Sequence, residues 1–94
     1  MKQYELMTIT DIDLGEDGSR DISNKIKDLI ASKKGKVLDS DFWGKRRFAY
    51  EIDHKSEGFY EVMNFELPAD AVSALKSELN YITGLVRYLV TATN

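Results

Sequence analysis

A basic and aromatic stretch in the middle of the chain holds the residues best suited to contact a ligand. Lys45, Arg46 and Arg47 follow one another directly, between the aromatic residues Trp43 and Tyr50. Cations pair with phosphates, and guanidinium groups and aromatic rings stack on unpaired bases, so this combination favours binding to single-stranded or looped RNA. The alternative is a solvated cluster that protects the edge of a sheet from aggregation.

The distribution of charge supports the RNA interpretation, although the chain as a whole is acidic. Its 94 residues include 13 Lys and Arg against 16 Asp and Glu, a net charge of −3. Residues 33–55, however, carry seven cations and four acids, a local balance of 7 − 4 = +3. Because a polyanion responds to the local field, an acidic protein with such a segment remains a candidate for binding nucleic acid.

Catalytic and metal-binding motifs are not indicated. The only histidine, His54, lies in a predicted hairpin turn, and there is no cysteine to hold a metal or form a disulfide. A phosphate-binding loop ending at Gly44 would need a glycine where Asp39 stands. The acids between Asp11 and Asp17 do not fit a calcium loop, whose glycine position would be occupied by an acid. We therefore predict no enzymatic activity, no metal and no cofactor.

Hydrophobic periodicity predicts strands that alternate with helices along the chain. The bend-permitting Gly44 lies inside the longest predicted strand, and Pro68 is a favourable residue for the start of a helix. The predicted order is a strand at 2–10, an acidic loop at 11–19, a helix from Ser19 or Arg20 to Lys34 that stops at Gly35, a strand at 36–52, a turn at 53–58, a strand at 59–67, a helix at 68–80 and a strand at 85–93.

Each predicted helix has one apolar stripe, which requires a single buried face. The first stripe is Ile22, Ile26, Leu29 and Ile30, with Leu29 expected in the core, and the second is Ala71, Val72, Leu75 and Leu79. Two strand-helix-strand halves with right-handed crossovers predict an α+β protein of the ferredoxin-like βαββαβ plan. We expect one domain across residues 1–94, a four-stranded antiparallel sheet and both helices on one sheet face.

The other sheet face is expected to be open and partly apolar. Met7, Tyr60, Val62 and Leu89 are its candidate exposed residues. An apolar face of this kind indicates a protein partner, and Tyr60, Val62 and Leu89 are the candidate contact residues.

Four segments of the chain resemble the ribosomal protein S6 family of the bacterial small ribosomal subunit. They are residues 1–5, 43–52, 63–68 and 86–90, in the same order and across nearly the whole chain. The central segment carries the most specific motif, in which Phe48 replaces the usual leucine. Glu51 and Asp53 also depart from the family pattern, which makes the basic patch weaker than usual.

The resemblance implies a structural component of the small ribosomal subunit. Family members are similar in pairing with ribosomal protein S18 and in binding the central domain of small-subunit ribosomal RNA. Matching positions make Lys2, Lys45, Arg46, Arg47 and Arg87 the candidate RNA contacts. Since the chain is acidic, binding to RNA without the partner should be weak.

Two other functions fit the same predicted fold. A small-ligand regulatory or acylphosphatase-like domain would need a glycine-rich, arginine-containing anion loop after the first strand, where this chain is acidic. An independent RNA-recognition module would need aromatic residues on the open sheet face, and Phe59 and Tyr60 offer an imitation of that pattern. With no apolar run near the roughly 20 residues of a membrane span, a cytoplasmic protein is expected.

Overall fold

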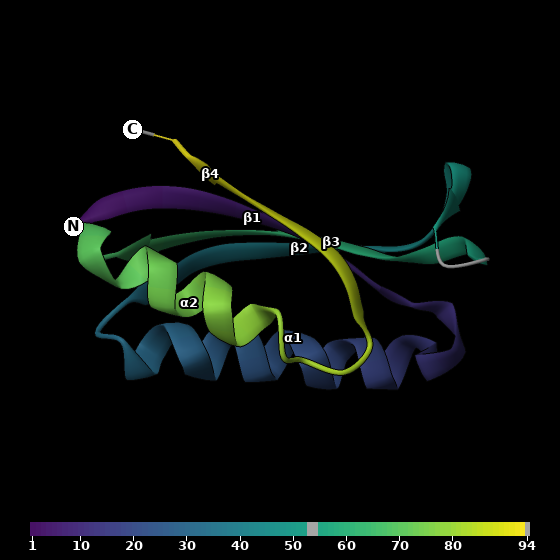
Figure 1. Cartoon of the computed structure of the whole chain (residues 1–94), viewed down its shortest axis with the longest axis horizontal. Helices are drawn as coiled ribbons and strands as arrows, with labels where there is room; N and C mark the ends of the chain where they lie inside the picture. The colour runs from purple at the N-terminus through teal and green to yellow at the C-terminus, as the bar shows by residue number, and fades with distance from the viewer. Residues whose placement is uncertain (53–54, 94) are drawn as a thin grey trace.

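The structure, a computed structural model, describes the backbone at residues 1–52 and 55–93 and the side chains at 1–47 and 57–93. His54 and Asp53 lie outside the described residues, as do the side chains of Phe48, Tyr50 and Glu51. Figure 1 shows a twisted sheet with two helices beneath it. The elements are β1 (Lys2–Asp11), η1 (Ile12–Leu14), α1 (Gly15–Ser32), β2 (Lys36–Ile52), β3 (Lys55–Leu67), η2 (Ala69–Ala71), α2 (Val72–Leu79) and β4 (Leu85–Ala92).

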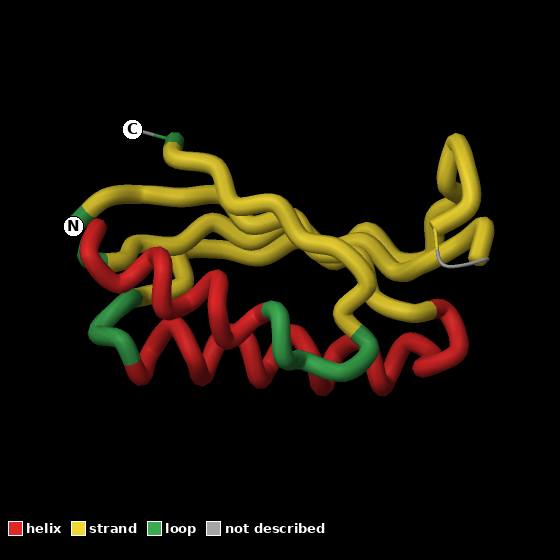
Figure 2. Tube along the Cα trace, in the orientation of Figure 1, coloured by secondary structure: helices red, strands yellow, loops and turns green. Residues whose placement is uncertain are grey.

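The four strands form one antiparallel sheet in the order β2-β3-β1-β4. Both helices cover the same face and leave the other open (Figure 2). This confirms the predicted ferredoxin-like plan. The central positions of β1 and β3 agree with the apolar residues that each carries on both faces. The helices cover one face of a central strand, and side chains of the two neighbouring strands flank its residues on the other face.

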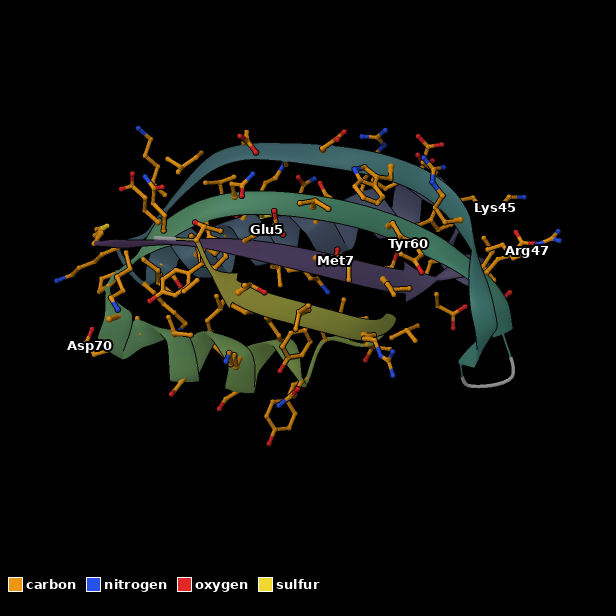
Figure 3. All side chains as sticks on the ribbon, turned by 90° about the horizontal axis from the view of Figure 1, so that it is seen from above. Glu5, Met7, Lys45, Arg47, Tyr60 and Asp70 are labelled. Carbon is orange, nitrogen blue, oxygen red and sulfur yellow. The ribbon has the colours of Figure 1, made fainter. Side chains whose placement is uncertain are left out.

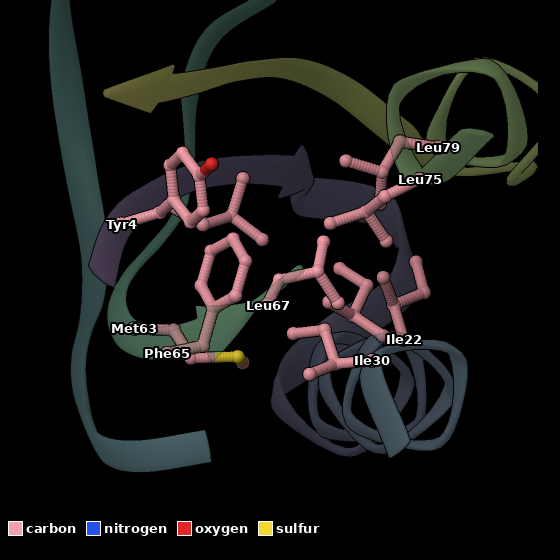
Figure 4. Packing of buried hydrophobic residues seen from close by; sticks show 10 residues of the cluster. Tyr4, Ile22, Ile30, Met63, Phe65, Leu67, Leu75 and Leu79 are labelled. Carbon is pink, nitrogen blue, oxygen red and sulfur yellow. The ribbon is translucent and has the colours of Figure 1, made fainter. Parts of the chain in front are cut away.

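The core lies between the sheet and the helices, as Figure 4 shows. Ile22, Ile26 and Ile30 of α1 are at most 5% exposed and pack with apolar residues from the central strands and α2, namely Tyr4, Leu6, Met63, Phe65, Leu67, Leu75 and Leu79. Each fully buried large side chain stabilises the fold by roughly 1.5 to 3 kcal/mol relative to exposure. Leu29 is only partly buried at the margin, so the prediction that it lies in the core was wrong.

The start of α1 differs from the prediction. The segment expected to be a loop, 11–19, contains the short 3₁₀ turn η1, and α1 begins at Gly15 rather than at Ser19 or Arg20. The Asp11 carboxylate accepts a hydrogen bond of 2.9 Å from the Asp13 amide and opens the turn. Acids in the first turn of α1 lie at the positive end of the helix dipole, so this segment is stable as helix.

The end of α1 also differs from the prediction. The helix ends at Ser32, and the left-handed residue that follows is Lys34, with φ of 67°, not Gly35. Gly35 has another function: a Cβ there would lie 2.6 Å from the Glu66 carbonyl oxygen and 2.8 Å from Ile30 Cγ2. Glycine at this position therefore allows the chain to cross closely over β3 before β2 begins.

Two other boundaries are shifted. The turn predicted at 53–58 is shorter, because β3 already begins at Lys55, and residues 53–54 are outside the described part. The helix predicted at 68–80 starts as the 3₁₀ turn η2 and becomes α-helical at Val72. Pairing in a long hairpin explains the first difference, since β-ladder hydrogen bonds extend into a polar sequence that lacks apolar alternation.

Candidate nucleic-acid interface

The β2–β3 hairpin positions the cations, and its bend lies at Gly44 as predicted. Gly44 has φ of 82°, and the register between β2 and β3 shifts between Phe42 and Gly44, which leaves Trp43 as an extra residue. A Cβ at Gly44 would meet nothing within 4 Å, so the backbone conformation, not lack of space, favours glycine there. Such a bulge increases strand twist and turns the residues that follow it.

The three cations after the bulge are exposed at the end of the sheet. Across the hairpin, Lys45, Arg46 and Arg47 are opposite Phe59, Gly58 and Glu57, respectively. Because successive strand residues alternate, Arg46 projects from the opposite side of β2 to its two neighbours. The cations therefore cover both sides of the hairpin, at the end of the sheet where Figure 3 labels Lys45 and Arg47.

The local interactions of these cations are weak and leave their charges available. Lys45 Nζ lies 3.6 Å from Glu57 Oε2 with the lysine side chain 62% exposed, and Arg46 Nη1 donates to the Lys45 carbonyl oxygen at 3.1 Å. An exposed pair of this kind contributes at most about 1 kcal/mol and is screened by salt. A phosphate can replace such a partner at little cost.

The other two candidate RNA contacts lie in different places. Arg87 of β4 pairs with Ile9, which pairs with Tyr60, which in turn is opposite Gly44. Arg87 thus shares the open sheet face and the hairpin end with the bulge. Lys2 pairs with Leu67 at the far end of β1. The ten residues of β1, of which Lys2 is the first, span about 30 Å, so the structure does not bring Lys2 together with the others.

An apolar row crosses the open face next to these cations. Met7 pairs with Val62 on one side and with Leu89 on the other, and Leu89 is 56% exposed. Tyr60 lies one row closer to the cationic end, and Figure 3 shows Met7 and Tyr60 near the centre of this face. The four predicted open-face residues are therefore contiguous.

Sequence patterns missed three features of this region. Ile9 points to the open face but is only 4% exposed, because Tyr60 and Arg87 flank it on the two neighbouring strands. The position of Trp43 beside the cations was expected, but not the hydrogen bond that holds its ring: Nε1 donates to Asp41 Oδ2 at 3.0 Å, with the residue 44% exposed. Glu61 lies on the same side of β3 as Phe59 and Met63 and therefore faces the helices, which the alternation of this strand indicates from the sequence alone.

The described residues do not support the other two functions. Phe59 is 9% exposed and stacks on Phe42 toward the helices, with 6.1 Å between ring centroids, so Tyr60 is the only aromatic residue of that pair on the open face. Acids surround the exit of β1, where an anion loop would be needed. Within residues 1–52 and 55–93 no three His, Cys, Asp or Glu side chains gather as metal ligands, and no helix has the length and apolarity of a membrane span.

Comparison with known proteins gives consistent matches over the whole chain. The family model described as Ribosomal protein S6 matches residues 3–92. "Small ribosomal subunit protein bS6" of Symbiobacterium thermophilum is 42% identical over 90 residues, 96% of this chain and 95% of that protein. The bS6 protein of Caldanaerobacter subterraneus is 36% identical over 94 residues, 100% and 99% of the two chains. The crystal structure of 30S ribosomal protein S6 from Thermotoga maritima is similar with a TM-score of 0.92 and 26% identity, covering 98% of this chain and 87% of that one.

A ferredoxin-like chain whose relatives are proteins of the small ribosomal subunit is a non-enzymatic protein component of a ribonucleoprotein particle. More particularly, the chain belongs to the ribosomal protein S6 family of the small ribosomal subunit. Its place of action is accordingly the ribosome, in the bacterial cytoplasm.

Proposed function

We propose that this protein, as one domain over residues 1–94, binds the central domain of small-subunit ribosomal RNA as a heterodimer with ribosomal protein S18. The observation that carries the proposal is the meeting of two surfaces at one end of the sheet. The apolar row formed by Met7, Val62 and Leu89 lies beside the end that holds Arg87 and the cations after Gly44.

The two surfaces suit two different partners. Exposed Leu89 and the partly exposed Tyr60 and Val62 would be buried by a protein, since burial of apolar area drives protein association. Lys45, Arg46, Arg47 and Arg87 would pair with phosphates. Lys2 remains a candidate for a separate RNA contact at the other end of β1.

Net charge predicts that the two binding events depend on each other. With 16 acids against 13 cations, the protein alone repels a polyanion over most of its surface. A basic partner seated on the open face would add cations next to the hairpin and extend the phosphate-binding surface. RNA affinity should therefore be much greater for the pair than for this protein alone.

The test is a gel-shift titration of a central-domain ribosomal RNA fragment with this protein, with S18, and with both. A shift at low protein concentration only with both proteins supports the proposal. Equal binding by S18 alone and by the mixture would contradict it, because this protein would then add no RNA contact. An unrelated RNA hairpin of the same length controls for non-specific binding.

A further inference from the structure

A polar cavity of about 250 Å³ lies on the helix side of the sheet, between α1 and the edge strand β2. It is away from the open face, since Figure 1 shows α1 beneath the sheet. Its lining comes from α1, β2 and β3 and consists of Arg20, Ser23, Asn24, Lys27, Ser40, Phe42 and Glu61. The cavity is smaller than the roughly 300 to 1,000 Å³ of drug-sized ligand sites, so it suits a single small polar group.

Glu61 gives the cavity a hydrogen-bond acceptor. It lies on the core-facing side of β3, opposite Phe42 and Thr8, and is only 7% exposed. The described part of the chain provides no hydrogen-bond or ion-pair partner for its carboxylate, whose oxygens still reach solvent. A carboxylate largely removed from bulk water favours a cavity occupant that supplies hydrogen-bond donors.

The helix wall supplies positive charge. Arg20, Asn24 and Lys27 are spaced four and three residues apart, so they form one polar stripe on α1. The Arg20 guanidinium lies 4.4 Å from the centre of the Phe42 ring, and its Nε and Nη2 donate to Glu16 Oε1 at 3.3 and 3.0 Å. The Nη1 group remains for another acceptor. Arg20 is already paired with Glu16, so Arg20 Nη1 and the Lys27 ammonium are the cationic donors available to an anionic group in the cavity.

We propose that this cavity binds one ribose-phosphate unit. The phosphate would pair with Arg20 and Lys27, and the ribose 2′-hydroxyl would donate to the Glu61 carboxylate. A carboxylate that accepts from ribose hydroxyls is a recurrent device in nucleotide sites.

That the ribose phosphate belongs to an RNA strand rests on the proposed function. That the cavity binds a ribose phosphate does not depend on the proposed function. A nucleotide of an RNA strand and a free ribose phosphate present the same group. DNA lacks the 2′-hydroxyl, so the cavity should discriminate RNA from DNA through Glu61.

The test is a titration of the full isotope-labelled chain with ribose 5-phosphate, followed by NMR. Saturable shifts are expected at the backbone amides of Ser23, Ser40 and Glu61. Binding of 2-deoxyribose 5-phosphate should be about tenfold weaker, the effect of losing one hydrogen bond to a charged acceptor. Glu61→Gln should remove this preference, whereas Glu66→Gln, on the other face of the same strand, should retain it.

A second variant covers the case in which Glu61→Gln fails to fold. Lys27 is partly exposed, and Lys27→Gln should weaken both sugar phosphates equally, about fivefold. If a short single-stranded RNA shifts the same amides, the ligand is a nucleotide of RNA. If only ribose 5-phosphate shifts them, the ligand is a free sugar phosphate. Either result supports the site. No saturable shift, or equal affinity for the deoxy sugar and for inorganic phosphate, overturns it.

Failure of this titration is distinguishable from failure of the proposed function. The titration uses the isolated chain and a small molecule, whereas the gel shift uses the partner and ribosomal RNA. A negative titration together with a positive gel shift would refute the proposed binding site in the cavity and leave the proposed function intact.

Discussion

The hydroxyl oxygens of Thr10 and Ser19 lie 2.7 Å apart in the buried space between β1 and α1. Both residues are at most 4% exposed, and they join the end of the first strand to the first turns of the helix. A polar pair at this position fixes how α1 leaves the sheet, because each hydroxyl is satisfied only when the other is in place.

A double-mutant cycle tests this pair. Ser19→Ala should lower the free energy of unfolding by about 1 to 2 kcal/mol, because the Thr10 hydroxyl is left buried without its partner. Thr10→Val combined with Ser19→Ala should cost less than the sum of the single changes. Urea denaturation measures all four proteins. Strict additivity would mean that the two hydroxyls do not stabilise each other.

Ile26 and Leu29 should differ in their effect on stability. Ile26 is 1% exposed, so Ile26→Ala should lower the free energy of unfolding by roughly 2 to 5 kcal/mol. Leu29 is partly buried at the margin of the core, so Leu29→Ala should lower it by about 1 kcal/mol. Thermal and urea unfolding of the two variants, which remove similar volumes, provide the comparison. Equal losses would place Leu29 in the core after all.

The two glycines that flank the first half of β2 should also differ. Gly35→Ala should cost about 1 to 3 kcal/mol, because the new methyl group would collide with the Glu66 carbonyl oxygen and Ile30. Gly44→Ala should cost about 1 kcal/mol, because the strain of a Cβ at φ of 82° outweighs the entropy that alanine removes from the unfolded chain. A larger loss at Gly44 than at Gly35 in urea unfolding would reverse this assignment.

Replacing Arg46 and Arg47 by alanine should weaken assembly with S18 on the RNA and flatten its salt dependence. Each lost phosphate contact removes about 0.7 to 0.9 from the slope of log affinity against log salt. Gel shifts at several salt concentrations measure the slope. The matched control is Lys25→Ala with Lys76→Ala, which removes the same charge from the helix layer and should keep the slope. An unchanged slope in the arginine variant would exclude direct phosphate pairing.

Leu89→Glu should prevent heterodimer formation without unfolding the protein. Leu89 is 56% exposed on the open face, so a charge there costs little in the free protein and a great deal in an apolar interface. Tyr81→Glu is the control, because Tyr81 is 87% exposed on the helix side. Co-purification with S18 and the melting temperature are the two measurements. Normal co-purification of the Leu89 variant would move the partner to another face.

Much of the fold was predictable because the spacing of apolar residues along a helix or strand shows which of its sides is buried. The spacing of apolar residues indicated the strands and the buried faces of the helices, and Gly44 indicated the bend. The first turn of α1 was missed because its small and acidic residues resemble a loop. Ser19 is buried only because Thr10, nine positions earlier, accepts or donates the hydrogen bond that it needs.

The functional surfaces were predictable in part. Adjacent cations such as Arg46 and Arg47 are visible in any sequence, whereas burial of Ile9 depends on Tyr60 and Arg87, which only the strand register brings beside it. The cavity at Glu61 was not predictable, since its helix wall is about 40 residues away in sequence. Parity marked Glu61 as facing inward, but gave no sign of what it would meet.

The position of β1 has a consequence for biosynthesis. The first strand lies between β3 and β4, so that Tyr4 pairs with both Phe65 and Ala92, and the Thr93 amide donates to the Gln3 carbonyl oxygen at 2.9 Å. During translation β1 is made before β3 and β4 is made after both, so β1 gains its second neighbour only when β4 has been made. Until then one edge of β1 has no strand beside it, and the four-stranded sheet is complete only when β4 has paired with that edge.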